Sequence, residues 1–280
     1  MTLFLTADAF GKLSDSATDA DIAAAMTPEP AVTDVILSAH GWQTSFDESC
    51  ADYNRFACGI LSHIGRSATR LSVNLHWPST LADTFKPASI VDVATFYVME
   101  RRADIVGENA MASAIRSVIR NQRVPLTLTL IGHSFGCKVV CAALQQLAHE
   151  GFDFGQVTIK AILLQAAFES DALEPGKQYG DVLKLPARIL ATKSTLDTAL
   201  CTWFKVAATV DPLKVFAKGE RTALGAVGPT PAAQQAYGLD RLVVADLTPV
   251  HESRKAMFKG PSGSHSDMAN EPVFDLVARF

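Results

Sequence analysis

The chain has 280 residues, of which 48% are hydrophobic, and its 29 acidic and 25 basic residues leave a formal net charge of -4. This length accommodates one large α/β core, so we expect a single domain over residues 1–280. A weakly acidic chain without a block of Lys or Arg lacks the electrostatic footprint of a protein that binds nucleic acid or an anionic membrane. A small neutral or apolar substrate fits this charge better.

The cysteines and the N-terminus indicate neither export nor metal binding. The five cysteines are odd in number and form no CxxC pair, so neither a disulfide framework nor a zinc site is expected. The N-terminus lacks a basic segment followed by an apolar one, and no stretch approaches the roughly 20 apolar residues of a spanning helix. We expect a cytoplasmic protein with no membrane span, no metal and no cofactor, and the sequence leaves its oligomeric state open.

The hydrophobic pattern predicts strands alternating with helices along the chain. The expected strands are residues 2–6, 34–39, 69–75, 126–131, 157–167, 187–192 and 241–247. The expected helices are residues 19–26, 46–64, 104–120, the segment after Ser134, and 273–280, whereas 85–106 is less regular and is expected to pack on the sheet. This alternation is typical of a mostly parallel, doubly wound sheet with helices on both faces.

The first feature with chemical potential follows the predicted strand 34–39, which leads directly into His40, Gly41 and Trp42. In a parallel sheet, the loop that leaves a central strand lies at the carboxyl edge. Gly41 would let the backbone turn so that the N–H of Trp42 points at a substrate oxygen. The alternative is that His-Gly is an ordinary turn after a strand.

The strongest motif is Gly132-His133-Ser134-Phe135-Gly136, which stands between the predicted strand 126–131 and a segment with helical periodicity. A serine at the apex of such a turn is forced toward positive φ, and the two glycines leave room for that backbone. The turn exposes the Ser134 hydroxyl and places the N–H of Phe135 at a helix N-terminus, where an oxyanion would form. The bare motif arises by chance, but its position between strand and helix favours a nucleophile.

Ser134 would need a base and an acid, and on this scaffold the chain order is serine, acid, histidine. Asp197 is the preferred acid because it follows the sixth predicted strand by a few residues. It can also be read as the N-cap of a short helix. Asp211 is the second candidate, and Asp171 and Glu169 come behind it.

Only His251 and His265 lie between the last predicted strand and the last predicted helix. His265 is the preferred base because small residues surround it and the next helix starts only after Asn270, which leaves the loop slack. His251 has charged neighbours, is expected in a solvated loop that enters a short helix, and is the alternative base. Asp267 is expected to cap the following helix or brace the loop. The residues expected to shape the site are His40, Gly41, Gly132, His133 and Gly136.

The segment 199–237 is long for a connection between strands and contains several Gly and Pro residues. Long irregular insertions usually cover or shape a site, so we expect a lid or cap insertion here. Its apolar residues, such as Trp203 and Phe204, would help to select the acyl group. The alternative is a surface excursion that packs on the sheet.

Several of these motifs together resemble an α/β-hydrolase. In order along the chain, HGWQTSFDES, GHSFGCKVV, LLQAAF and SHSDM are similar to a poorly characterised group of serine esterase or lipase-like members of that superfamily. The resemblance extends from about residue 35 to the C-terminus. It implies the α/β-hydrolase fold and acyl transfer to water through an acyl-serine, with carboxylic esters as the usual substrates.

The sequence thus predicts a serine hydrolase that acts on a small-molecule ester. Its expected triad is Ser134, Asp197 and His265, and the N–H groups of Trp42 and Phe135 would form the oxyanion hole. A thioesterase or lipase that uses the same mechanism is one alternative. A non-catalytic interaction module that kept the fold is another.

Overall fold

Seven strands form one parallel sheet in the computed structural model, which describes residues 1–14, 19–80, 90–204, 222–258 and 262–280. The strands are β1 (Thr2–Thr6), β2 (Asp34–Ala39), β3 (Arg70–His76), β4 (Leu126–His133), β5 (Val157–Leu164), β6 (Ala187–Lys193) and β7 (Leu242–Asp246). Their order in the sheet is β1-β3-β2-β4-β5-β6-β7, and every neighbouring pair is parallel. The order reverses between β2 and β4, so the loops that follow these two strands meet at the carboxyl edge.

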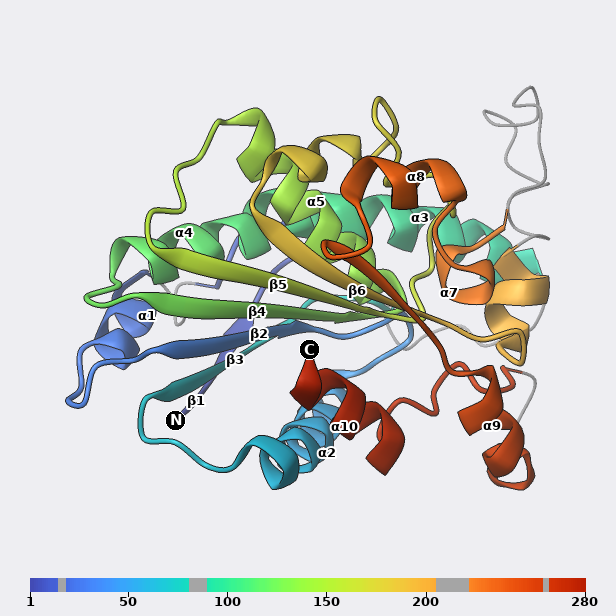
Figure 1. The fold of residues 1–280 in the computed structure, drawn as a ribbon, viewed down its shortest axis with the longest axis horizontal. Helices are drawn as coiled ribbons and strands as arrows, with labels where there is room; N and C mark the ends of the chain where they lie inside the picture. Colours follow the sequence, from blue (N-terminus) through green and yellow to red (C-terminus); the bar gives the residue numbers. More distant parts are fainter. Residues whose placement is uncertain (15–18, 81–89, 205–221, 259–261) are drawn as a thin grey trace.

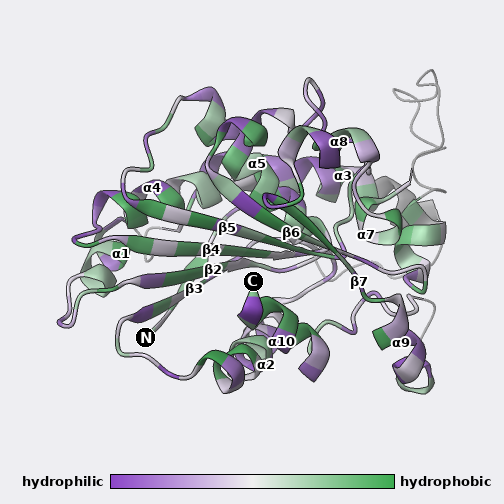
Figure 2. Ribbon diagram, in the orientation of Figure 1, coloured by the Kyte–Doolittle hydropathy of each residue, from purple (hydrophilic) through white to green (hydrophobic). Residues whose placement is uncertain are grey.

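Helices cover both faces of this sheet (Figure 1). One face carries α3 (Ile90–Val106), α4 (Ala112–Arg120) and α5 (Phe135–His149), and the other carries α2 (Phe46–Ile64) and α10 (Glu271–Arg279). Successive strand residues point to opposite faces, so Leu128 and Leu130 of β4 join the first core and Ile131 joins the second. Burial on both faces makes the central strands largely apolar, as the hydropathy colouring in Figure 2 shows.

Shorter elements complete the described fold. They are α1 (Asp19–Met26), α7 (Leu224–Val227), α8 (Pro231–Tyr237), α9 (Thr248–Arg254), the π-helical turns Gly107–Met111 and Ala199–Trp203, and the 3-10 turns Gly180–Lys184 and Lys255–Met257. In the part of the chain that the structure describes, no helix combines the length and apolar character needed to span a bilayer.

Helix α2 packs beside α10 on the lower face of the sheet, as oriented in Figure 1. The helix starts at a capping box, in which Ser45 Oγ accepts from the Glu48 N–H at 3.3 Å and the Glu48 carboxylate accepts from the Ser45 N–H at 2.8 Å. Further along, Gly59 lies so close to the Phe274 ring of α10 that a β-carbon would collide with it. Helix α2 therefore packs against α10, whose core lies beneath β4, β5 and β6.

The seven expected strands are confirmed, with ends that shift by up to three residues, and one helix is longer than expected. The segment 85–106 was expected to be irregular and the helix to begin at residue 104, but α3 already begins at Ile90 and continues through the π-helical turn into α4. A π-helical turn inserts an extra residue and shifts the apolar face, which hides a continuous helix from a 3.6-residue period. Residues 205–221, which include Asp211 and the centre of the expected cover 199–237, lie outside the described residues.

Candidate active site

Ser134 occupies a strained turn between β4 and α5 at the carboxyl edge. Its backbone has φ 56 and ψ -122, the positive φ that the motif predicts. A β-carbon on Gly132 would lie 2.5 Å from the Gly136 carbonyl oxygen, and one on Gly136 would overlap the Ala39 carbonyl oxygen. The two glycines thus let the N-terminus of α5 approach the end of β2 closely.

The structure brings Ser134, His265 and Asp197 into one hydrogen-bonded line. Ser134 Oγ lies 2.9 Å from His265 Nε2, and His265 Nδ1 lies 2.7 Å from Asp197 Oδ2. An ionised carboxylate can only accept, which assigns the proton to Nδ1 and leaves Nε2 free to accept from the serine hydroxyl. A serine, a histidine and an acid so arranged can deliver an activated hydroxyl to an electrophile.

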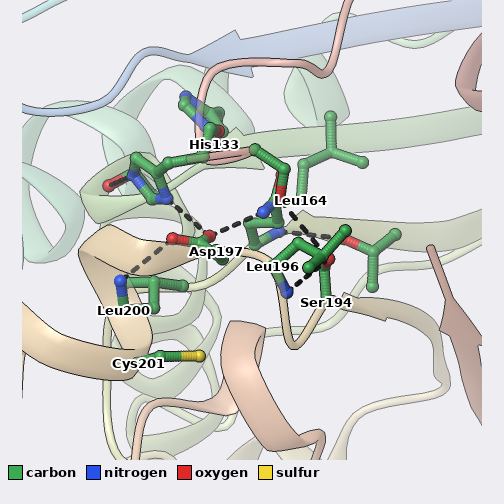
Figure 3. Close-up of polar contacts among 12 residues, drawn as sticks. His133, Leu164, Ser194, Leu196, Asp197, Leu200 and Cys201 are labelled. Carbon is green, nitrogen blue, oxygen red and sulfur yellow. Dashed lines mark hydrogen bonds and ion pairs between the residues drawn. The ribbon is translucent and has the colours of Figure 1, made fainter. Parts of the chain in front are cut away.

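Asp197 is fully buried, and donors from three parts of the chain satisfy its carboxylate (Figure 3). Besides His265, Gln165 Nε2 donates to Oδ2 at 2.6 Å and the Leu200 N–H donates to Oδ1 at 2.9 Å. The contact with Leu200 is the capping interaction that was the alternative reading of Asp197. One oxygen therefore caps a turn, while the other faces the histidine.

Gln165 was not singled out from the sequence, although it holds the acid in place. The residue is buried, has φ 44 where β5 ends, and its N–H donates to Thr192 Oγ1 at 2.9 Å. The strand predicted over 157–167 therefore stops at Leu164. The sequence signal that could have identified Gln165 is its position as a lone amide within an apolar stretch. A buried amide needs a polar partner inside the core.

His251 does not reach Ser134, and the expectation that it lies in a solvated loop is wrong. It is a buried residue of α9, and its Nδ1 lies 2.8 Å from Ser194 Oγ. The same Ser194 Oγ accepts from the Leu196 N–H at 3.2 Å (Figure 3), so His251 supports the loop that carries Asp197. Its charged neighbours face outward, while the imidazole faces the core, and this burial lowers the pKa of His251.

Two contacts hold the loop that carries His265. Asp267 forms a two-pronged ion pair with Arg254 at 2.7 and 2.8 Å, so it braces the loop, whereas Asn270 caps α10. His133 Nε2 lies 2.8 Å from the His265 carbonyl oxygen and must donate to it. Desolvation by burial lowers the pKa of His133 to about 4, which keeps this ring neutral near pH 7.

Two backbone N–H groups next to Ser134 are available to a ligand. A β-carbon on Gly41 would lie 3.0 Å from Ser134 Cβ, which places the loop after β2 against the serine. The rings of Trp42 and Phe135 lie 6.1 Å apart, and neither residue's N–H has an acceptor among the described residues. The N–H of Gln43, by contrast, donates to the backbone of the loop after β3 at 3.2 Å.

His40 fixes the orientation of the peptide between Gly41 and Trp42. Its Nδ1 donates to the Gly41 carbonyl oxygen at 2.9 Å, and its Nε2 accepts from the Trp77 N–H at 3.2 Å. In a trans peptide the C=O and N–H point in opposite directions, so holding the Gly41 carbonyl directs the Trp42 N–H away from it. Desolvation by burial lowers the pKa of His40 to about 3, so the neutral ring that this pattern needs is present near pH 7.

A cavity of about 1110 Å³ opens onto Ser134 and His265. One wall is aromatic: the Phe96 ring lies 6.0 Å from that of Trp42 and 5.9 Å from that of Phe204. Phe204, from the expected cover, thus lines the cavity, whereas the side chain of Trp203 lies outside the described residues. In the described part of the chain, His, Cys, Asp and Glu form no group of three or more that could hold a metal ion.

Comparison with known proteins identifies a family for most of the chain. A family described as α/β-hydrolases of unknown function (DUF900) matches residues 14–256, and no curated protein matches the chain. The match includes Ser134 and Asp197 but ends before His265, so the place of this histidine rests on the structure. The parallel sheet with helices on both faces agrees with the α/β-hydrolase fold.

Gly136→Ala should lower the free energy of unfolding by an amount near the upper end of the range of about 1–3 kcal/mol that overpacking costs. The reason is that its β-carbon would meet the Ala39 carbonyl rather than a flexible side chain. The control is Gly151→Ala, where space is open and only the positive φ costs roughly 1 kcal/mol. Urea unfolding of both variants checks this, and equal losses would show that the elbow is not tightly packed.

The free energy of unfolding should fall as the pH drops from 6.5 toward 4. His40 and His133 stay neutral in the folded state but protonate near pH 6.5 in the unfolded chain, so the unfolded state binds more protons in this window. Each would contribute up to about 1.4 kcal/mol per pH unit.

Urea unfolding at pH 6.5 and 5 tests this dependence in the wild type, in His133→Gln and in Asn54→Gln, which changes an exposed side chain that does not titrate. His133→Gln should lose less stability on acidification than the wild type, by about 1.6 kcal/mol over this interval. Asn54→Gln should match the wild type. An identical loss in all three proteins would refute the role of His133.

Proposed function

The chain belongs to this family of α/β-hydrolases, and from its site we propose a serine hydrolase that cleaves carboxylic esters through an acyl-serine intermediate. The observation that carries the proposal is the hydrogen-bonded line from Ser134 Oγ through His265 to Asp197 Oδ2. A protonated hydroxyl is a poor nucleophile near pH 7, and this line supplies both a base and the group that orients it.

In the first step, Ser134 Oγ attacks the ester carbonyl carbon while its proton passes to His265 Nε2. The carbonyl electron pair moves to oxygen, where the N–H groups of Trp42 and Phe135 would donate to the resulting oxyanion. A single donor of this kind contributes on the order of a hundredfold to a thousandfold in turnover. The Asp197 carboxylate stabilises the imidazolium that forms.

In the second step the tetrahedral intermediate collapses, the C–O bond to the alcohol breaks, and His265 Nε2 returns its proton to the leaving oxygen. The product is an acyl-Ser134 and a free alcohol. Water then attacks the acyl carbon with the same histidine as base, and the carboxylic acid leaves as Ser134 regains its proton. His265 Nε2 therefore carries one proton from Ser134 to the alcohol in the first half of the cycle and one proton from water back to Ser134 in the second.

The surroundings of the line favour catalysis over a non-catalytic interaction domain. A positive φ at a non-glycine residue costs roughly 1–3 kcal/mol, and Ser134 keeps it within a turn that exposes a hydroxyl beside a base. The aromatic wall of Trp42, Phe96 and Phe204 supplies an apolar site for an acyl group. The strained backbone of Ser134, the alignment of His265 with its hydroxyl and the apolar wall are the features expected of a site that hydrolyses a small ester.

Ser134→Ala and His265→Ala should each lower kcat for p-nitrophenyl butyrate by on the order of a thousandfold or more, because each removes a reacting group. His251→Gln should retain kcat within about tenfold, since His251 contacts Ser194 instead of Ser134. Circular dichroism establishes that the variants are folded. Full turnover in His265→Ala together with a collapse in His251→Gln would move the base to His251.

Gln165→Leu should lower kcat tenfold to a hundredfold with little change in KM, because Asp197 loses a donor that positions it. The matched control is Gln234→Leu on α8, which removes a side-chain bond to the Pro229 carbonyl at 2.8 Å. Steady-state kinetics on both variants checks the prediction. A loss in the control equal to that in Gln165→Leu would assign the effect to general destabilisation.

A further inference from the structure

The cavity at Ser134 continues beneath the sheet, between the lower face of β2 and β3 and helix α2. We call this extension the β2–β3 arm and define it by Ser38, Ser72 and Asn74 from the strands and by Tyr53 and Phe56 from α2. The lower face of β2 and β3 carries polar side chains here, in contrast to the apolar face that β4, β5 and β6 present to α10.

Two side chains in this arm are buried and lack partners. Ser38 of β2 and Asn74 of β3 are paired in the sheet register, and their exposed fractions are 8% and 2%. Neither the Ser38 hydroxyl nor the Asn74 amide has a hydrogen-bond partner among the described residues. Both side chains are buried except where they line the cavity, so their hydrogen-bonding groups are available to a ligand there.

Tyr53 shows that the neighbouring polar groups are occupied. Its hydroxyl donates to the Leu75 carbonyl oxygen at 2.7 Å, which ties α2 to β3. Ser49, also buried on α2, donates to the Phe46 carbonyl oxygen at 2.7 Å. Among the described residues that define the arm, Ser38 and Asn74 are therefore the buried ones with free hydrogen-bonding groups, whereas Ser72 is only half-buried.

We propose that the β2–β3 arm is a subsite for an uncharged polar part of the substrate, bound by Asn74 and Ser38; this inference rests on the proposed ester hydrolysis. The amide offers two donors and an acceptor, and the hydroxyl offers one donor and further acceptor capacity, which suits ether, hydroxyl or amide groups. A charge held at this buried pair would need an opposite charge, which neither residue supplies. The charged residues in the cavity lining are exposed or half-buried: Glu48, Asp52, Arg55, Arg66 and Arg70. A plain alkyl chain would leave the amide and the hydroxyl without partners.

The position of the pair also limits the substrate. Ser38 precedes His40, at the start of the oxyanion loop, by two residues, which is about 7 Å along an extended strand. The polar group must therefore be joined to the reacting carbonyl by a spacer of a few bonds. The aromatic wall on the other side of Ser134 would hold the apolar part, so the substrate has one polar and one apolar end.

Fluorophosphonate probes with matched tails test this subsite. Ser134 Oγ forms a bond to phosphorus, the P–F bond breaks, fluoride leaves and the hydroxyl proton passes to His265. Three probes carry a methyl group, an alkyl chain, or an oligo(ethylene glycol) chain of the same length as the alkyl chain. Intact-mass spectrometry over time gives the second-order labelling rate constant for each.

The wild type should react at least tenfold faster with the glycol-tailed probe than with the alkyl-tailed probe. Asn74→Leu should reduce this ratio at least tenfold, and Ser38→Ala should reduce it at least threefold. The control is Asn54→Leu, the same substitution at an exposed position of α2 that does not line the cavity, and its ratio should match the wild type.

The probes separate the two levels of the proposal. No labelling of the wild type by the methyl probe would overturn the serine hydrolase and the subsite together. Labelling by the methyl probe with the same tail ratio in the wild type and in Ser38→Ala and Asn74→Leu would overturn the subsite alone. If Asn74→Leu does not fold, Ser38→Ala decides the outcome.

Discussion

A carboxylate without exposed surface, that of Asp197, determines how the carboxyl edge of this sheet is organised. Removing such a charge from water is costly unless donors replace the water, and here they come from the end of β5, from the turn after Asp197 and from the histidine loop. Two of these donors depend on further features of the chain. Gln165 has an unusual φ of 44, and His265 lies on a loop that contacts of His133 and Asp267 hold in place. The hydrogen bond between His265 Nε2 and Ser134 Oγ therefore depends on the contacts that hold Asp197 and His265.

The opposite side of Ser134 depends on close backbone approach. Helix α5 can reach the end of β2 only because Gly136 has no side chain, and the same closeness brings the loop of Gly41 and Trp42 beside the serine. Neutral His40 then sets the direction of the Trp42 N–H through the Gly41 carbonyl. A rigid arrangement of donors costs no reorganisation when charge develops on a substrate oxygen, which is how such sites stabilise a transition state.

Periodicity in the sequence was enough to predict the strands, because each is a short apolar run bounded by clear turns. The chain order of the fold left several candidates for the acid and the base, and the preferred ones, Asp197 and His265, are those that the structure brings to Ser134. Their catalytic roles stay predictions. What the sequence could not supply depends on contacts between distant segments. His251 looks solvated beside charged neighbours, and the π-helical turn conceals α3. Gln165, Ser38 and Asn74 gain meaning only when their neighbours are known.

The central claim is that Ser134 carries the acyl group during turnover. Mixing the protein with a p-nitrophenyl ester, quenching in acid within the first turnovers and measuring the intact and peptide masses tests it most directly. The account predicts an added acyl mass located on the peptide that contains Ser134, at a stoichiometry that approaches one when deacylation is slow. Continued release of p-nitrophenol by Ser134→Ala, or acylation at another residue of the site, would contradict it.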